Sequence, residues 1–561
     1  MDYSEQYNYN PTLAWNDKVE EYFINAYGAD HFSKISKALT HPSSYSCVRV
    51  NTLKATSDSV TEKLLTILQE TGHVSDGALK SSVQKFPVQK CQVPGLDYVL
   101  FVNGSGPHDI QYSSALNKPV KEVIVSRKCA EAVLRGAQVF VPGVLACSAH
   151  VEIGDTVAVS VAVEQPVDGG WSVGITRGIT LEGTETDPHH LQRRGLYIGQ
   201  GTTLLSRAGI FRASHGVAVQ MTERVYNLPS FHGVLEGEIF LQNLPSIITA
   251  HALDPQPGDR VLDMCAAPGG KTTALAILMR DAGEIVAADR SHNKVLDIKK
   301  LAAEMGLKCI TAHRQDALKA VCQSNETIDY PNQHSNETKG VASDCHASPL
   351  DDMESVRSKA VDSHLACNKD VSEEMENQRN YQSKADIRKS MRRMRNGPGR
   401  NQTIGGMVEK SKGFPPNSFD RVLLDAPCSA LGLRPRLFAG EETMESLKKH
   451  GKYQKKMFDQ AIQLVRPGGT LVYSTCTLNP GENEAVIRYA LDKYKFLSLA
   501  PQHPRIGGRG LIGGCELVDE NRVEKWLTPE EAELVQRFDP SSSLDTIGFF
   551  IAKFSVGQKD I

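Results

Sequence analysis

The sequence predicts an α/β protein whose main domain contains a doubly wound, mostly parallel sheet. Strand and helix patterns alternate from residue 240 onward, which is typical of a parallel sheet with helices on both faces. A Val- and Gly-rich segment with short β-like runs precedes this alternation, and a long polar stretch at 323–413 interrupts it. We therefore expect three folded parts, at 1–117, 118–222 and 223–561, with an unstructured insert in the third.

The first part, residues 1–117, mixes helical and β-like patterns. The runs VEEYFINAYG (19–28) and DSVTEKLLTILQET (58–71) have the apolar spacing of amphipathic helices. The run CVRVNTLK (47–54) has the apolar and β-branched residues of a short strand. We predict a mixed α+β region at this end of the chain.

The second part, residues 118–222, carries short β-like runs separated by turn signals. These runs are EVIVS (122–126), GAQVFVP (136–142), DTVAVSVAV (155–163), WSVGITRG (171–178) and HGVAVQM (215–221). Short strands at such close intervals predict a small all-β barrel or sandwich.

The third part, residues 223–561, supplies the alternating pattern. The predicted strands are RVLDM (260–264), EIVAAD (284–289), Cys309–Ala312, FDRVLLD (419–425), TLVYST (470–475) and IGFFIAKF (547–554). The predicted helices are TTALAILMRDAG (272–283), HNKVLDIKKLAAEMG (292–306) and YQKKMFDQAIQLV (453–465). In such sheets ligands bind at the carboxyl ends of the strands, so chemistry is expected there.

The polar stretch at 323–413 has 91 residues, two of them aromatic, and shows no apolar period. Such a segment buries too little apolar surface to offset chain entropy, so we predict that it is disordered. Its basic tract at 384–400 indicates a nuclear-localisation or RNA-contacting element, or alternatively a solvated loop without function.

The composition argues against several classes of protein. No apolar run approaches the ~20 residues of a membrane span, and the first residues lack the basic and apolar regions of a secretion signal. The 12 cysteines include no CxxC pair, so nothing indicates a metal site. A net charge of −3 gives no overall nucleic-acid signal but leaves room for local basic surfaces. We expect a monomer in the reduced cytoplasm, with the nucleus as the alternative, and no membrane or metal partner.

The first strand end carries the loop Asp263-Met-Cys-Ala-Ala-Pro-Gly-Gly-Lys-Thr-Thr, whose small residues allow a ligand to approach the backbone. It is not a Walker A loop, because Cys265 stands where that motif requires glycine, and no G-x-G-x-x-G loop is present. Asp289 and Asp316 follow the next two strands and could bind ribose hydroxyls and an adenine amino group, or could only cap helices. Taken together, they predict an adenosine pocket without a phosphate loop, which suits S-adenosylmethionine better than ATP or NAD.

Two cysteines follow the next two strands, Cys428 in Asp-Ala-Pro-Cys-Ser and Cys476 in Ser-Thr-Cys-Thr. A lone cysteine is usually a small buried apolar residue, but two at neighbouring strand ends beside a cofactor loop favour a nucleophile. A zinc deaminase would need a second cysteine where Leu431 stands. Methylation of cytosine at carbon 5 needs a thiolate, a ring contact and a base, and Asp425 suits the ring contact. The residues alone do not rank the two thiols.

The three motifs at 263–272, 423–429 and 473–477 resemble those of Nop/Sun-type RNA cytosine-5 methyltransferases. The resemblance implies that Cys476 is the nucleophile, that Cys428 assists release of the methylated RNA, and that Asp425 and Lys271 contact the target base. It also implies an S-adenosylmethionine pocket formed by Cys265, Ala266, Ala267, Pro268, Gly269, Gly270, Lys271, Asp289, Asp316 and Asp425. The run RVNTLK (49–54) resembles the family's RNA-contacting N-terminal region.

The β-rich second part resembles a PUA domain, a compact RNA-binding barrel, through AVLRGAQVFVPGV (132–144) and GIFRASHGVAVQM (209–221). A PUA domain in this position resembles the member-6 branch of the family, which implies tRNA as partner and methylation of the acceptor stem near its 3′ end. Candidate phosphate contacts are Arg127, Lys128 and Arg135, which could equally be solvated surface charges.

Two departures and two alternatives accompany this resemblance. The polar insert falls between the third and fourth strands of the catalytic domain, where loops tolerate insertion. Ala430 replaces the glycine usual after Ala-Pro-Cys-Ser. A non-catalytic RNA-binding protein is one alternative, although both cysteines are present, and a methyltransferase for another RNA class, such as rRNA or mRNA, is the other.

Overall fold

A computed structural model describes residues 7–70, 87–112, 120–167, 170–181, 195–231, 233–322, 411–517 and 522–559. All of these belong to one unit of the chain, formed by 1–323 and 407–561. The stretch predicted to be disordered lies outside the described residues except for 411–413, and so does the whole basic tract at 384–400. Among the described residues, no helix is long and apolar enough to cross a membrane.

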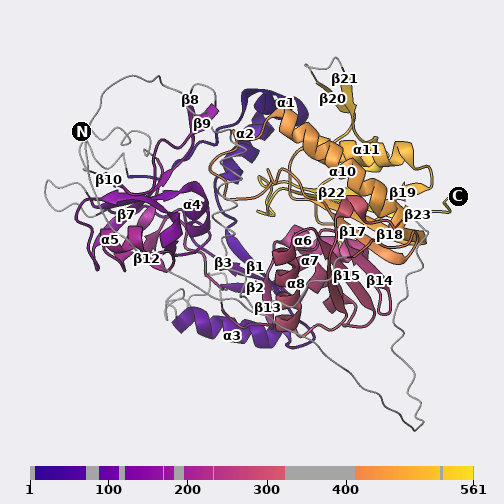
Figure 1. Cartoon of the computed structure of the whole chain (residues 1–561), viewed down its shortest axis with the longest axis horizontal. Coiled ribbons are helices and arrows are strands. Elements are labelled where there is room, and N and C mark those ends of the chain that lie inside the picture. The colour runs from indigo at the N-terminus through magenta and orange to yellow at the C-terminus, as the bar shows by residue number, and fades with distance from the viewer. Residues whose placement is uncertain are drawn as a thin grey trace, which may run out of the picture. The chain divides into compact units, whose positions relative to one another are not determined.

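The third part of the chain folds around an eight-stranded, mostly parallel sheet (Figure 1). Its strands, in spatial order, are β16 (Ile310–Arg314), β15 (Glu284–Asp289), β14 (Arg260–Asp263), β17 (Phe419–Asp425), β18 (Val465–Thr475), β23 (Phe549–Val556) and β19 (Leu497–Leu499), with β22 (Val535–Phe538) also paired to β23. The first five strands run parallel, and β23 is antiparallel to its neighbours. The strand order reverses between β14 and β17, where ligands bind in doubly wound sheets.

Helices cover both faces of this sheet, as the predicted fold class requires. One group packs with the cores that contain Ile285 and Ala287: α6 (Leu244–Leu253), α7 (Gly270–Leu278) and α8 (His292–Met305). The other group packs with the core that contains Val286 and Ala288: α10 (Met444–Leu464) and α11 (Glu484–Lys493). Successive side chains of a strand point to opposite faces, so these alternating residues of β15 mark the two layers.

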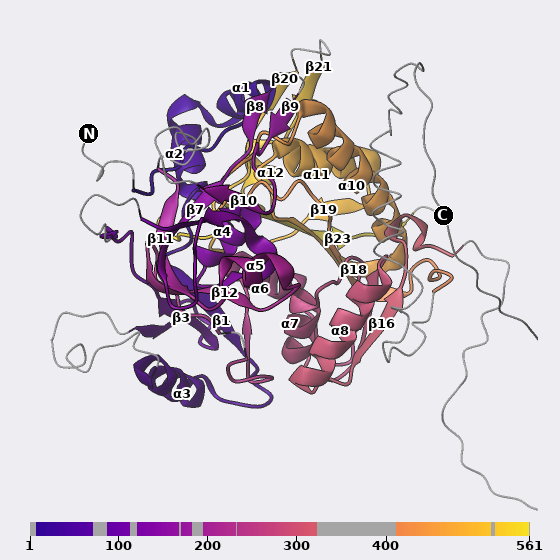
Figure 2. The same ribbon diagram turned by 60° about the vertical axis from the view of Figure 1, so that its left-hand side comes forward.

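The second part of the chain forms a seven-stranded sheet around its own apolar core. Its strands, in spatial order, are β10 (Ile179–Leu181), β6 (Val144–Ser148), β4 (Glu122–Ser126), β7 (Thr156–Ala162), β11 (Tyr197–Thr203), β12 (Val217–Arg224) and β5 (Val139–Phe140). Figure 2 shows α4 (Arg127–Val133) and α5 (Arg207–Arg212) beside these strands. The predicted strand 171–178 is wrong in part: only β9 (Gly170–Ser172) forms, and it pairs with β8 (Gln165–Val167) in a separate hairpin.

The described residues of the N-terminal part form three helices and contribute to a four-stranded antiparallel sheet. The helices are α1 (Asp17–Tyr27), α2 (Ala29–Leu39) and α3 (Ser57–Glu70), and the strands, in spatial order, are β13 (Ile239–Leu241), β1 (Tyr45–Val50), β3 (Val99–Asn103) and β2 (Val88–Lys90). Strand β13 comes from the range predicted to be catalytic. The chain therefore returns to complete this sheet after the seven-stranded sheet of the second part and before it enters α6.

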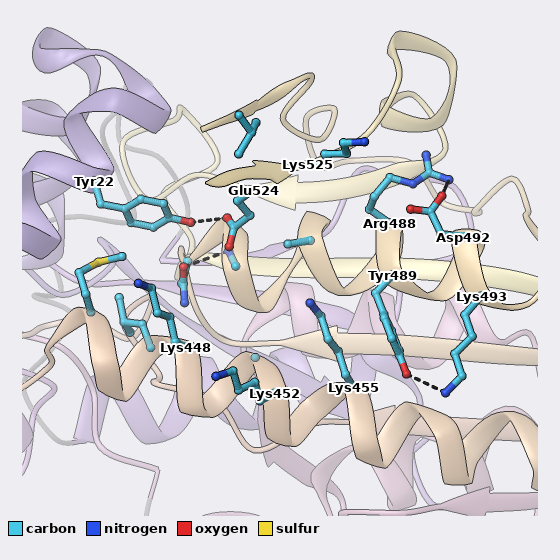
Figure 3. Close-up of a pocket in the computed structure, with 17 residues that line it drawn as sticks. Tyr22, Lys448, Lys452, Lys455, Arg488, Tyr489, Asp492, Lys493, Glu524 and Lys525 are labelled. Carbon is cyan, nitrogen blue, oxygen red and sulfur yellow. Dashed lines mark hydrogen bonds and ion pairs between the residues drawn. The ribbon is translucent and has the colours of Figure 1, made fainter. Parts of the chain in front are cut away.

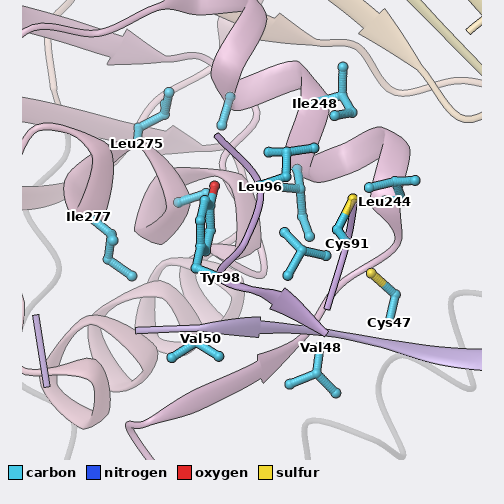
Figure 4. Close-up of a cluster of buried hydrophobic side chains, with 14 of the residues drawn as sticks. Cys47, Val48, Val50, Cys91, Leu96, Tyr98, Leu244, Ile248, Leu275 and Ile277 are labelled. Atoms are coloured by element: carbon cyan, nitrogen blue, oxygen red, sulfur yellow. The ribbon is translucent and has the colours of Figure 1, made fainter. Parts of the chain in front are cut away.

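The N-terminal sheet and the catalytic sheet share one apolar core. One cluster of buried residues contains Val48 and Val50 of β1 together with Ile248 of α6 and Leu275 of α7, and Figure 4 shows Leu96 and Tyr98 of the N-terminal part on the side of β1 where these helices lie. Burial of such side chains contributes roughly 1.5–3 kcal/mol each. This shared core holds the N-terminal part against α7, the helix that follows the predicted cofactor loop.

Candidate active site

The predicted cofactor loop connects β14 to α7. Gly269 precedes the helix with φ +109°, a conformation that residues with a side chain rarely adopt. Thr272, in the first turn, donates a hydrogen bond of 2.8 Å to Oδ2 of Asp263, while Oδ1 of this buried carboxyl group has no partner among the described residues. Burial raises the pKa of Asp263 to about 7.

A cavity of about 590 Å³ opens at the carboxyl ends of β14, β15 and β16. Three predicted residues line it, Cys265, Asp289 and Asp316. Asp289 also accepts a hydrogen bond of 2.9 Å from the Ser291 amide, and Asp316 one of 3.1 Å from the Leu318 amide. Asp316 is thus the N-cap of a short 3-10 helix (Ala317–Lys319), whereas Asp289 stabilises the turn before α8, and both residues also line the cavity.

Other predicted loop residues lie beside the cavity rather than in its lining. Ala266 and Ala267 pack against β15 and α8, Gly270 meets Phe240, and Pro268 is exposed. The sequence did not single out several residues that do line the cavity, namely Arg290, Ser291, Lys294, Gln315, Pro427, Tyr453 and Met457. Those that follow Asp289 or precede Asp316 could have been found from their place at the strand ends, whereas Tyr453 and Met457 come from a distant helix.

The two predicted cysteines meet at the carboxyl ends of the neighbouring strands β17 and β18. The Sγ atoms of Cys428 and Cys476 lie 3.4 Å apart. Their two loops are joined by a hydrogen bond of 2.7 Å between the hydroxyls of Ser429 and Thr477, and by one of 3.0 Å from the Gly432 amide to the Cys476 carbonyl. The loop geometry therefore fixes one thiol against the other.

Lys271 and Asp425 form an ion pair beside the thiols. The Lys271 Nζ lies 2.8 Å from Oδ2 of Asp425, and the Ser474 hydroxyl donates a hydrogen bond of 2.6 Å to Oδ1. Burial opposes the positive charge of Lys271, but attraction to Asp425 outweighs it and raises the pKa of Lys271 above its ordinary value. Lys271 is therefore a fixed cation. Asp425, predicted as both a base contact and a cofactor residue, is held by these partners, and it does not line the 590 Å³ cavity.

The electrostatic surroundings distinguish the two thiols. The hydrogen bond from Cys428 lowers the pKa of Cys476 below its ordinary value, with a further contribution from the Lys271 cation. The same hydrogen bond, together with burial, raises the pKa of Cys428 well above its ordinary value. A thiolate is the nucleophilic form of cysteine, so the direction of the pKa shift suits Cys476 to the nucleophilic role that the resemblance implied.

The buried carboxylate of Glu482, which lies behind the thiols, was not predicted from the sequence. Glu482 is fully buried and accepts hydrogen bonds from the Ser429 amide at 3.0 Å, from Gln454 at 2.8 Å and from Asn479 at 3.0 Å. It therefore connects the Cys428 loop to α10 and to the turn after Cys476. The polar run Asn-Pro-Gly-Glu-Asn, directly after the second cysteine motif, was the available signal.

The predicted RNA contacts differ in their exposure. Lys128 and Arg135 are exposed. The Arg127 side chain is only 10% exposed and forms ion pairs with Glu131, Glu164 and Glu441, so its charge is compensated within the protein and does not suit a phosphate contact.

The RVNTLK run is also partly unsuited to the RNA contact that its resemblance implied. Arg49 is fully buried and donates hydrogen bonds of 2.8 Å to Gln242 and to Thr273 of α7. Asn51 is equally buried and donates to the carbonyls of Gly237 and Met305. Both residues join elements of the fold.

Comparison with known proteins decides the family. The family described as 16S rRNA methyltransferase RsmB/F matches residues 250–330 and 367–555, and the PUA domain matches residues 121–166. The human tRNA (cytosine(72)-C(5))-methyltransferase NSUN6 is 33% identical, over 93% of this chain and 91% of its own length. The chain belongs to the RsmB/F (Nop/Sun) family. It is a PUA-containing, S-adenosylmethionine-dependent RNA cytosine-5 methyltransferase.

Two further relatives bear on this RsmB/F methyltransferase. The rRNA (cytosine-C(5))-methyltransferase NOP2C of Arabidopsis thaliana is 65% identical, over 99% of this chain and 93% of its own length. The crystal structure of NSun6 from Pyrococcus horikoshii with SFG has a TM-score of 0.62 and 25% identity, covering 97% of this chain and 99% of that one. The shared fold therefore includes the N-terminal part and the barrel as well as the catalytic domain.

Proposed function

We propose that this protein forms 5-methylcytosine in tRNA, on the acceptor stem near the 3′ end, through a covalent bond between Cys476 and the target cytosine. The observation that carries the covalent mechanism is the pair of thiols 3.4 Å apart beside the Lys271–Asp425 ion pair. The preference for tRNA is supported by similarity across nearly the whole chain to enzymes named for cytosine 72 of tRNA in mouse, human and Pyrococcus horikoshii.

The residues at the cavity fit the proposed role in binding S-adenosylmethionine. Asp289 and Asp316 offer carboxylates for the ribose and the adenine amino group, while Met264 and Met457 offer apolar surface. The unpartnered oxygen of Asp263 lies at the start of the loop. When bound, S-adenosylmethionine supplies an electrophilic methyl group carried on a positively charged sulfur.

In the proposed reaction, the Cys476 thiolate adds to carbon 6 of the cytosine, and the electron pair displaced from the carbon 5–carbon 6 double bond makes carbon 5 nucleophilic. Asp425, held by Lys271 and Ser474, accepts a hydrogen bond from the polar edge of the ring and so orients the base. Carbon 5 then takes the methyl group. The target base must leave its stack to reach the thiolate.

Release of the product requires loss of the carbon 5 proton. Once Cys476 is bonded to carbon, its negative charge is gone, so the hydrogen bond that raises the pKa of Cys428 is weakened. We assign to Cys428 the loss of its own proton to water followed by acceptance of the carbon 5 proton. The double bond re-forms as the Cys476 thiolate departs, which restores the enzyme.

Replacement of each cysteine tests this assignment. Cys476→Ala should abolish methyl transfer, because it removes the thiolate that adds to carbon 6, and the thiol that remains nearby, Cys428, has a pKa raised well above its ordinary value. Cys428→Ala should retain the addition step but accumulate a protein–RNA adduct that survives denaturing gel electrophoresis. A Cys476→Ala protein that still methylates RNA, or an adduct formed by that variant, would overturn the role of Cys476.

A second candidate substrate is rRNA, favoured by the 65% identity with a protein named as an rRNA methyltransferase. Incubation of the full chain with S-adenosylmethionine and either total tRNA or isolated rRNA, followed by bisulfite sequencing, separates the two. A new 5-methylcytosine in a tRNA acceptor stem supports our proposal. Modification confined to rRNA supports the second candidate and overturns the first.

A further inference from the structure

A second cavity, of about 890 Å³, lies beside the thiol loops and has no residue in common with the proposed cofactor cavity. Its walls are α10, α11 and the hairpin formed by β20 (Gly514–Leu517) and β21 (Arg522–Lys525) (Figure 3). Helix α10 follows the Cys428 loop in the chain, and Asn479 and Gly481 of the turn after Cys476 also line the cavity. The cavity is thus formed by segments that continue directly from both cysteine motifs.

Basic side chains outnumber acidic ones in this lining, although the whole chain has a net charge of −3. Lys448, Lys452 and Lys455 recur every three or four residues along α10, a spacing that places them on one face of the helix. Figure 3 shows them on one side of the cavity, with Arg488 and Lys525 on the other.

The acidic groups in the lining already have partners. Glu524 accepts hydrogen bonds of 2.7 Å from the Tyr22 hydroxyl and 2.9 Å from the Trp526 ring nitrogen. Asp492 pairs with Arg488 at 3.0 Å. Within the described part of the chain, no ion pair engages Lys452 or Lys525, so their charges remain available to an anion.

An aromatic ring accompanies these cations. Tyr489 of α11 lines the cavity, and the amino groups of Lys455 and Lys493 lie 5.4 Å and 5.2 Å from the centre of its ring. Tyr489 donates hydrogen bonds to Asp459, which also pairs with Lys493 at 2.9 Å. A basic groove with an aromatic wall is typical of surfaces that follow a single strand of nucleic acid.

We propose that this groove binds the sugar-phosphate backbone of the RNA substrate, in the segment next to the target cytosine. The proposal rests on RNA as the substrate and holds for tRNA and rRNA alike. Asn479 and Gly481 bring one end of the groove to the turn that follows β18 and Cys476, and from there the groove runs between α10 and α11. A strand whose flipped base reaches Cys476 can therefore continue into the groove. Phosphates held by Lys452 and Lys525 would fix the strand while the base is out of its stack.

The test compares two doubly substituted full-length proteins that have equal charge. Lys452→Ala/Lys525→Ala removes the two unpaired groove cations. Lys456→Ala/Lys495→Ala removes two exposed lysines outside the cavity lining, one of them on α10, and serves as the matched control. The probe is a fluorescent tRNA transcript that ends in CCA, with its dissociation constant measured from 50 to 200 mM KCl. Thermal melting and S-adenosylmethionine binding show that both proteins are folded.

We expect the groove variant to bind the transcript at least about tenfold more weakly near 100 mM salt. The slope of the logarithm of the binding constant against the logarithm of the salt concentration should decrease in magnitude by about one to two, because each phosphate contact contributes about 0.7–0.9 to that slope. The control should bind like the unsubstituted protein. An equal loss of RNA affinity in both variants would mean that the effect depends on overall charge and not on the groove. An unchanged RNA affinity in the groove variant would mean that the groove binds something else, such as an acidic protein segment. Either result overturns the proposal. Bisulfite sequencing of tRNA and rRNA with the unsubstituted protein tests the proposed function separately.

Discussion

At the scale of single residues, two neighbours lower the pKa of Cys476: the Cys428 thiol, whose hydrogen bond contributes most, and the Lys271 cation, which contributes less. Lys271 is paired with Asp425 at 2.8 Å and acts on the Cys476 thiolate, whose pKa lies below its ordinary value. Because the thiolate is the reactive form, activity should rise with pH through the pKa of Cys476 and then level off. A lowered pKa moves that rise to lower pH and leaves more thiolate at pH 7.

Lys271→Met should raise the pKa of Cys476, since the cation is lost and the Asp425 carboxylate then opposes the thiolate without compensation. We expect the rising part of the profile of kcat/KM against pH to move to higher pH, with a rate at pH 7 lower by about threefold or more. Alkylation of Cys476 by iodoacetamide, measured over the same pH range, checks the shift directly. Lys271→Arg keeps the cation and should retain the original profile, whereas an unshifted profile in Lys271→Met would contradict this account.

The residue that departs from the family motif has a backbone conformation that suits glycine. Ala430 has φ +56°, in the left-handed region, and its carbonyl accepts a hydrogen bond of 2.6 Å from Arg436. An alanine there carries a conformational cost of about 1 kcal/mol that glycine avoids. The substitution seen in the sequence therefore has a physical cost, but the loop keeps the conformation that the motif requires.

Ala430→Gly should raise the free energy of unfolding by up to about 1 kcal/mol, because glycine adopts the left-handed conformation without strain, although it also loses more chain entropy on folding. Gly432→Ala, two residues away, is the opposite case: its new Cβ would overlap the Gly548 backbone, and we expect a loss of at least about 2 kcal/mol. Urea unfolding of both variants measures the two changes. A destabilised Ala430→Gly protein would show that the methyl group contributes packing that outweighs the strain.

At the scale of elements, the sequence predicted most of what positions the site. Strands β14, β15 and β17 begin and end within a residue of their predicted limits, because apolar runs are bounded there by turn residues and charged side chains. The carboxyl ends of parallel strands meet at one edge, so Cys428 and Cys476 could be predicted as neighbours from chain order alone.

Other elements depend on contacts that periodicity does not reveal. Strand β13 has only three residues and is defined by pairing with β1, which lies nearly two hundred residues earlier in the chain. Helix α6 is apolar on nearly all sides because it is buried between sheets, so it lacks the amphipathic pattern by which helices are recognised. Arg49 looked like an RNA contact, but its partners are Gln242, which lies between β13 and α6, and Thr273 of α7.

At the scale of the whole molecule, contacts between distant segments also explain why Arg127 does not suit the RNA contact predicted for it. Its partners come from three segments: Glu131 from its own helix, Glu164 from the barrel and Glu441 from the loop before α10. The Leu437 amide of that loop also donates a hydrogen bond of 3.1 Å to Glu131. Arg127 therefore connects the barrel to the catalytic domain, whereas its neighbour Lys128 is exposed. Arg127 and Lys128 are adjacent in the sequence and were both predicted to contact phosphate, but their surroundings in the structure differ.

A pair of single substitutions separates these roles. Arg127→Ala should lower the free energy of unfolding by about 2 kcal/mol, because it leaves the largely buried carboxylates of Glu131 and Glu164 without their shared partner, whereas the half-exposed Glu441 can be solvated. Lys128→Ala should leave stability within about 0.5 kcal/mol and instead weaken binding of a tRNA transcript, with a salt slope reduced by about one. Chemical unfolding and RNA titration of both proteins provide the measurements. If Arg127→Ala unfolded like the unsubstituted protein but bound RNA more weakly, Arg127 would be a phosphate contact after all, and its three ion pairs would have to open when RNA binds.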